Sequence, residues 1–294
     1  TAYEIRLSLV GSEMCIRDRG ELIRVFESLK WLDRESQEHN LVLSSRTDAG
    51  VNVRLNGGVV QIDRSLWDAL TPRKMIRAID DRLSKNIAFL DVKEVDENWN
   101  PRMANYRVYR YRLEGIEFWK YPGDVFLEWL EIFEGTYDAT NFARLEEGKN
   151  PLRTIISCKP WIVDGRVVGF EIIGEAFLWN QVRRTAMALH KMCIGELEPK
   201  DVLSAKLNPQ VEYDFGVAPS DWLILWGVDW DEIPLPESLT EIRCFSAPPQ
   251  GAAVERTMRK RWREGARHEM KSLLYSQWAE LGKLPRVRHR ELVD

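Results

Sequence analysis

The residues best suited to chemistry lie at positions 44–51, with the sequence SSRTDAGV. This stretch separates the apolar run 41–43 from the strand-like segment 58–63. An apolar strand that ends at a polar cluster and then turns at a glycine places one carboxylate, that of Asp48, where it can face a cleft. Such a carboxylate can act as a nucleophile or a base. The alternative is a simple turn, in which Asp48 bonds its own backbone and Gly50 supplies a positive φ.

The sequence on either side predicts the elements that must position this stretch. Thr71 followed by Pro72 is a typical helix start, because threonine caps the first turn and proline fits the first helical position. Asp164-Gly165 predicts a two-residue hairpin turn, and Gly195 a helix end. We expect helices at 20–32, 71–83, 126–133 and 178–193, a short helix from 199, strands at 41–43, 58–63, 87–95, 101–114, 155–163, 166–174 and 221–228, and a loop with a short helix at 135–145.

Helices alternate with hairpin-paired strands twice along the chain. This order favours an α+β fold with two halves over a parallel βαβ array. In the predicted strand 101–114, Tyr109 and Tyr111 have the same parity. Their rings are therefore expected on one face of that strand.

Three motifs in this chain resemble those of one enzyme family. RTDAGV at 46–51 is similar to the active-site stretch of the TruA-type tRNA pseudouridine synthases. RVYRYR at 107–112 resembles the R-x-Y-R-Y strand of that family, and FLWNQVRR at 177–184 resembles its F-L-x-x-x-V-R helix start. The motifs follow the order of the family, and weaker similarity covers about residues 20 to 230.

The resemblance implies two pseudo-symmetric domains with mainly antiparallel sheets flanked by helices. These domains would meet near residue 105, with an RNA cleft between them. We expect a catalytic α+β domain at 20–105, a second α+β domain at 106–230, a linker at 231–250 that holds four prolines, and a basic helical tail at 251–294.

The resemblance also implies a role for individual residues. Asp48 would be the catalytic carboxylate, and Arg183 would pair with it and keep it ionised. Tyr109 would stack on the target base and help to remove its C5 proton, with Tyr111 as the alternative if the register shifts by one pair. The RNA contacts implied by the same motifs are Arg46, Arg107, Arg110 and Arg184.

The reaction implied is the isomerisation of uridine to pseudouridine in the tRNA anticodon arm, around positions 38 to 40, without cofactor or metal. The partners implied are tRNA and a second copy of the chain in a homodimer. One alternative is an RNA-binding protein of the same fold that performs no chemistry. Another is an unrelated aspartate-dependent hydrolase, which no second carboxylate or metal cluster near Asp48 supports.

The chain departs from the family pattern in two places. Asn52 stands where a histidine is common. Residues 1–19 fit the rest of the chain poorly and resemble a translated sequencing adapter, so we expect a foreign segment that forms a substitute strand or a loose arm. The alternative is a genuine first strand at residues 3–10, where apolar residues alternate.

Charge is distributed unevenly along the chain. The formal net charge is −4, yet residues 251–294 hold eleven basic and six acidic side chains, a balance of +5 that leaves −9 on residues 1–250. Apolar residues at helical spacing, including Val254, Met258, Trp262 and Met270, predict a helix there. This helix either packs on the body of the protein or contacts RNA phosphates.

Cysteine and histidine spacing indicates neither a disulfide framework nor a zinc site. The four cysteines form no C-x-x-C pair and share no ligand spacing with the four histidines. The longest apolar stretch, at 222–228, is far shorter than the roughly 20 residues that span a bilayer. The scattered cysteines predict a protein of the reducing cytoplasm, and no secretory leader is visible.

Overall fold

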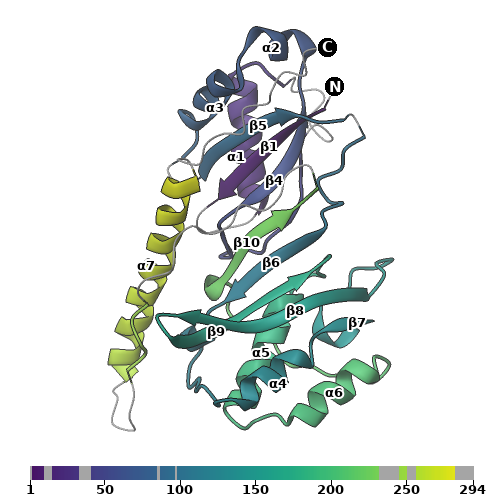
Figure 1. The fold of residues 1–294 in the computed structure, drawn as a ribbon, viewed down its shortest axis with the longest axis vertical. Coiled ribbons are helices and arrows are strands. Elements are labelled where there is room, and N and C mark those ends of the chain that lie inside the picture. The colour runs from purple at the N-terminus through teal and green to yellow at the C-terminus, as the bar shows by residue number, and fades with distance from the viewer. Residues whose placement is uncertain are drawn as a thin grey trace.

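A computed structural model describes residues 2–9, 15–32, 41–84, 87–96, 98–231, 245–249 and 256–281. The first of two sheets has the strand order β2-β4-β1-β5, with antiparallel pairing throughout. Its strands are β1 (Ala2–Leu9), β2 (Leu41–Leu43), β4 (Asn56–Gln61) and β5 (Ile87–Glu94), and its helices are α1 (Cys15–Ser28), α2 (Arg64–Ala69) and α3 (Pro72–Asp80). Figure 1 shows this unit at one end of the molecule.

The second sheet has six strands in the order β3-β10-β6-β9-β8-β7. They are β3 (Asn52–Val53), β6 (Tyr106–Tyr111), β7 (Gly135–Asp138), β8 (Leu152–Val163), β9 (Arg166–Gly174) and β10 (Leu223–Asp229). Helices α4 (Val125–Glu131), α5 (Gln181–Cys193) and α6 (Pro199–Leu207) lie together beside this sheet (Figure 1). All pairs are antiparallel except that of β3 with β10. The predicted α+β class is confirmed.

Local signals in the sequence placed several elements correctly. Thr71 caps α3 by accepting a hydrogen bond from the Lys74 amide, with proline at the first helical position. Asp164 and Gly165 both have positive φ, 50° and 69°, as a type I′ hairpin turn requires. The prediction of a loop at 135–145 was partly wrong, because β7 occupies its first four residues and pairs with β8. Four residues are too few to show a strand periodicity.

β3 links the two sheets. Eight residues separate β3 from β2 of the first sheet. Nevertheless, β3 pairs in parallel with β10 of the second sheet. The Asn52 side chain donates hydrogen bonds to the carbonyls of Asp221, at 2.9 Å, and Leu223, at 3.4 Å. The residue that departs from the family pattern therefore fixes this strand on the second sheet. The turn at 44–51 consequently runs from one sheet to the other.

The prediction of a loose arm at the N-terminus is wrong, because β1 lies between β4 and β5 in the middle of the first sheet. Tyr3, for example, is opposite Val60 on one side and Glu94 on the other. The helix predicted to begin at residue 20 also begins earlier, at Cys15. Residues 2–9 thus form a strand, as both the substitute-strand and the genuine-strand interpretations require.

Deleting residues 1–9 is therefore expected to lower the melting temperature, by about 5 °C or more. The deletion leaves two rows of backbone donors and acceptors, on β4 and β5, without their ladder partners. Differential scanning calorimetry of the shortened and full chains measures this effect. An unchanged melting temperature would contradict the central position of β1.

The tail helix α7 (Arg256–Leu281) packs along the side of the molecule and passes both sheets (Figure 1). The Trp278 indole donates to the Arg54 carbonyl at 3.2 Å, and Arg54 in turn donates to Gln277 at 2.9 Å. The packing interpretation of the tail is confirmed for the apolar face formed by Ala266, Met270, Leu273, Leu274 and Trp278, all buried. Val254 and most of the predicted linker lie outside the described residues.

Candidate active site

The turn at 44–51 is held rigidly at its start. Ser44 donates from its amide to the Gly57 carbonyl at 2.9 Å and from its hydroxyl to Asn56 at 2.6 Å, and Asn56 donates to the Ser45 carbonyl at 3.0 Å. The Val51 amide donates to the Asp48 carbonyl at 3.1 Å, which closes the turn. Asp48 is therefore fixed by its backbone.

Gly50 is required at this turn. Its φ is +83°, and a Cβ atom there would lie 2.6 Å from the Ser220 hydroxyl oxygen and 3.1 Å from an Asp221 carboxylate oxygen. Any other residue would be strained and would collide with these side chains. Because Gly50 lies so close to Ser220 and Asp221, the turn packs directly against the segment that precedes β10.

The Asp48 side chain reaches the start of α5. Its Oδ2 accepts a hydrogen bond from Arg183 Nη1 at 2.6 Å, and its Oδ1 accepts one from Trp179 Nε1 at 2.9 Å. The side chain keeps 26% of its surface exposed, so the carboxylate lies in a partly open site. The simple turn interpretation is wrong for this side chain, because both of these partners lie more than 130 residues away in sequence.

Arg183 is itself held at three points. Its Nε donates to the Ala218 carbonyl at 2.7 Å, and its Nη1 also donates to the Asn180 side chain at 3.1 Å. Asn180 is the N-cap of α5 and adopts the left-handed conformation, with φ 62°, which asparagine tolerates better than most residues. The guanidinium is thus oriented before any substrate binds, and its pairing with Asp48 is a charge-assisted hydrogen bond.

Trp179 was not singled out by sequence reasoning. It occupies one of the unspecified positions in F-L-x-x-x-V-R, where any residue satisfies the motif. One property of the sequence could have identified Trp179. Its indole N–H is a hydrogen-bond donor four residues before Arg183, the arginine expected to bind Asp48.

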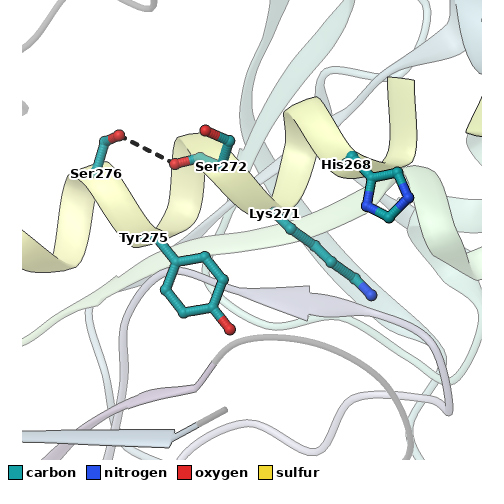
Figure 2. Close-up of a pocket in the computed structure, with 5 residues that line it drawn as sticks. All are labelled: His268, Lys271, Ser272, Tyr275 and Ser276. Atoms are coloured by element: carbon teal, nitrogen blue, oxygen red, sulfur yellow. Dashed lines mark hydrogen bonds between the residues drawn. The ribbon is translucent and has the colours of Figure 1, made fainter. Parts of the chain in front are cut away.

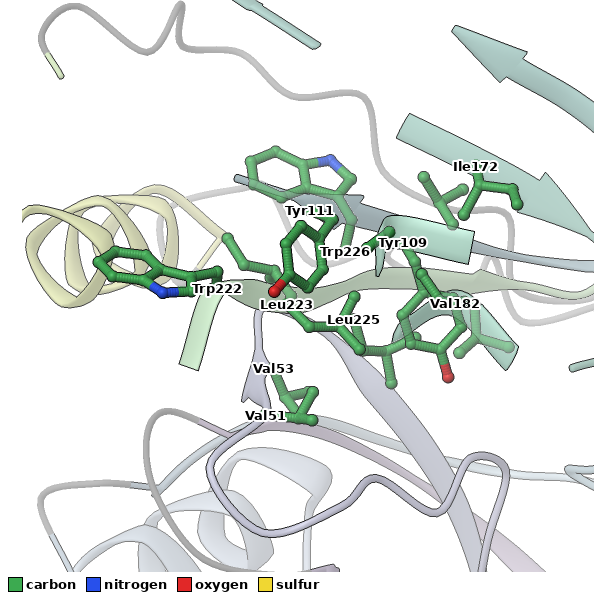
Figure 3. Close-up of a cluster of buried hydrophobic side chains, with 14 of the residues drawn as sticks. Val51, Val53, Tyr109, Tyr111, Ile172, Val182, Trp222, Leu223, Leu225 and Trp226 are labelled. Carbon is green, nitrogen blue, oxygen red and sulfur yellow. The ribbon is translucent and has the colours of Figure 1, made fainter. Parts of the chain in front are cut away.

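Both candidate tyrosines are buried, but Tyr109 keeps 8% of its surface exposed and Tyr111 none. Tyr109 packs edge-on against Phe177, with ring centroids 5.1 Å apart, at the segment that leads into Trp179. Tyr111 is fully buried and donates its hydroxyl to the Pro219 carbonyl at 2.8 Å. Burial raises the pKa of the Tyr111 hydroxyl well above its ordinary value. Figure 3 shows both rings within the buried cluster, with Val182 beside Tyr109.

The four arginines predicted to contact RNA lie in different surroundings. Arg46 is exposed beside Asp48, and Arg184 pairs with Asp214 at 2.9 Å near the surface. Arg110 pairs with Glu171 at 2.6 Å, and its guanidinium lies 3.8 Å from the centre of the Trp226 ring. An RNA contact by Arg110 would require these interactions to break.

Arg107 is buried and connects the two sides of the site. It donates to the Ser45 hydroxyl at 3.3 Å, to the Arg102 carbonyl at 2.8 Å and to the Glu175 carbonyl. Ser45 belongs to the turn that carries Asp48, and Glu175 begins the connection from β9 to α5. These bonds suit Arg107 to holding the turn in place, and an RNA contact by its guanidinium would require them to break.

A hollow of about 540 Å³ lies along α7 (Figure 2). Among the residues that the structure describes, those lining it are His268, Lys271, Ser272, Tyr275 and Ser276, all on this helix. None of these residues contacts Asp48, Trp179 or Arg183 in the interactions described above. We therefore assign the hollow no part in the chemistry.

Among the described residues, no group of three or more histidine, cysteine, aspartate or glutamate side chains is arranged to hold a metal ion. No helix within the same ranges combines the length and the apolar character needed to cross a membrane.

Comparison with known proteins gives a consistent result. A family model described as tRNA pseudouridine synthase matches residues 130–231. "tRNA pseudouridine synthase A" of Thermococcus gammatolerans is 34% identical over 217 residues, which cover 73% of this chain and 76% of that protein. The protein of the same name from Methanoculleus marisnigri is 33% identical over 214 residues, 72% of this chain and 73% of its own. On this identity and coverage, the chain belongs to the tRNA pseudouridine synthase family.

Proposed function

We propose that this pseudouridine synthase converts uridine to pseudouridine in the anticodon arm of tRNA, around positions 38 to 40. The observation that carries the proposal is the 2.6 Å pair of Asp48 with Arg183, in a site that leaves the carboxylate partly exposed. The name shared by the curated relatives supports tRNA as the substrate. The anticodon arm is the position implied by the motif resemblance.

The reaction rearranges one nucleotide. The C1′–N1 glycosidic bond breaks, the base turns, a C1′–C5 bond forms, C5 loses its proton and N1 gains one. We propose that Asp48 supplies the negative charge beside C1′, as a nucleophile or base that also stabilises the positive charge developing on the ribose. Arg183 orients this carboxylate through a charge-assisted hydrogen bond.

Tyr109 is proposed to stack on the uridine once the base has left its helix. An extruded base requires an aromatic or apolar surface to replace the stacking that it loses. Tyr109 lies on β6 against Phe177, close in the fold to the segment that holds Trp179 and Arg183. Its hydroxyl would assist removal of the C5 proton.

Tyr109→Phe and Tyr109→Leu separate these two contributions. We expect the phenylalanine variant to bind tRNA as the parent does and to turn over about 100-fold more slowly, because general acid–base assistance is worth roughly 10²- to 10⁴-fold. The leucine variant should also lose affinity, since it lacks a stacking face. Single-turnover rates and gel-shift affinities measure the two effects. Parent-like behaviour of both variants would assign the role to another residue.

The function is tested by mapping pseudouridine in an anticodon-arm transcript. After incubation with the full chain, carbodiimide treatment and primer extension should give stops at one or more of positions 38 to 40. Stops at other positions would contradict the proposed position of the modification. The absence of any stop would contradict the proposed activity. Binding without any product would favour the RNA-binding alternative.

We also propose that two copies of the chain, located in the cytoplasm, grip one tRNA. The exposed apolar side chains near α4, among them Phe118, Tyr121 and Leu127, support such an interface. Light scattering of the protein with and without tRNA measures the stoichiometry.

A further inference from the structure

We propose that Trp179 is a positioning residue for Asp48, which fixes the plane of the catalytic carboxylate through its indole N–H. This inference rests on the proposed function of Asp48. A carboxylate has two oxygens and about four lone pairs. One donor, Arg183 on Oδ2, leaves the group free to rotate about its Cβ–Cγ bond. A second donor on Oδ1, at 2.9 Å from Trp179, removes that freedom.

The indole is itself held in place. The Arg144 amide donates to the Trp179 carbonyl at 2.8 Å, which forms an isolated β-bridge between these residues. The Arg144 guanidinium lies over the indole, 4.2 Å from the ring centre. A cation at this distance attracts the ring face and restricts its tilt. The N–H is thus aimed at Asp48 before substrate arrives.

The two donors occupy one lone pair on each oxygen, so others remain free for the ribose. Trp179 keeps 43% of its surface exposed, which shows that the indole lies at the open side of the site and does not close it. Small displacements of a reacting group cost about 100-fold in rate. Loss of the indole donor should therefore slow the chemical step and leave the many phosphate contacts to tRNA intact.

Trp179→Phe tests this role, because phenylalanine keeps an aromatic face and lacks the N–H. We expect kcat to fall about 10- to 100-fold with KM within about threefold of the parent. Trp129→Phe, a half-buried indole on α4 outside the site, is the matched control and should retain the parent rate. If Trp179 served only as a stacking surface, Trp179→Phe would keep kcat, and that outcome would overturn the proposal.

An NMR measurement is independent of turnover. In ¹⁵N-labelled protein, the Trp179 indole resonance, assigned by its loss in Trp179→Phe, should move upfield in the proton dimension in Asp48→Ala and remain in place in Asp214→Ala. Asp214 is an exposed carboxylate that pairs with Arg184. An unmoved resonance in Asp48→Ala would refute the hydrogen bond. If the resonance moves in Asp48→Ala but the parent protein makes no pseudouridine, the proposed function is refuted, whereas the hydrogen bond between Trp179 and Asp48 is supported.

Discussion

Asp48→Asn is expected to reduce pseudouridine formation by at least about 10⁴-fold, the scale seen when a residue that performs the chemical step is removed. Asparagine has nearly the same shape but carries no negative charge. Arg183 retains the Asn180 and Ala218 oxygens as acceptors, so the site should remain folded. Single-turnover assays with excess enzyme measure the chemical step directly.

Affinity for tRNA should change little in this variant, within a few-fold, because phosphate contacts contribute most of the binding free energy. Asp214→Asn provides the control: it alters an exposed carboxylate on the same protein and should retain the parent rate. Turnover near the parent rate in Asp48→Asn would show that another group performs the chemistry.

Arg183→Ala is expected to lower kcat by about 100- to 1,000-fold, the effect of removing one preorganised donor from a reacting charge. The variant loses the 2.6 Å pair with Asp48 and the bond to the Ala218 carbonyl at once. Arg183→Lys should recover little of this loss, since an ammonium group cannot reproduce the geometry of a guanidinium that serves three acceptors.

Lys191→Ala is the matched control on the same helix. Lys191 lies in the last turn of α5, two turns beyond Arg183, and contacts none of the site residues in the interactions described. Its removal should leave kcat unchanged. Equal losses in Arg183→Ala and Lys191→Ala would indicate general damage to α5 and would contradict a specific pairing with Asp48.

The sequence predicted those parts of the fold that depend on local signals. The hairpin at Asp164-Gly165 and the cap and proline of α3 require only neighbouring residues to form. Position 52 behaves differently. The sequence marked it as a departure from the family, but the crossing of β3 to the second sheet depends on carbonyls about 170 residues away. No local pattern contains that information.

The same distinction applies to the site. Asp48 and Arg183 were identified through motif resemblance, and the structure brings them together. Trp179 escaped notice because its partner lies 131 residues away and its motif position accepts any residue. The burial of Arg107 was equally hidden, since its acceptors include backbone carbonyls that adjoin it only in the folded chain.

The most direct test of the central claim is tritium release from a tRNA transcript labelled at C5 of its uridines. Isomerisation replaces the C5 proton by a bond to C1′, so each turnover liberates one label into water. The full chain should release tritium from a transcript with uridine at positions 38 to 40, and a transcript with cytidine at these three positions should release none. Equal release from both transcripts, or no release from either, would contradict the proposed isomerisation in the anticodon arm.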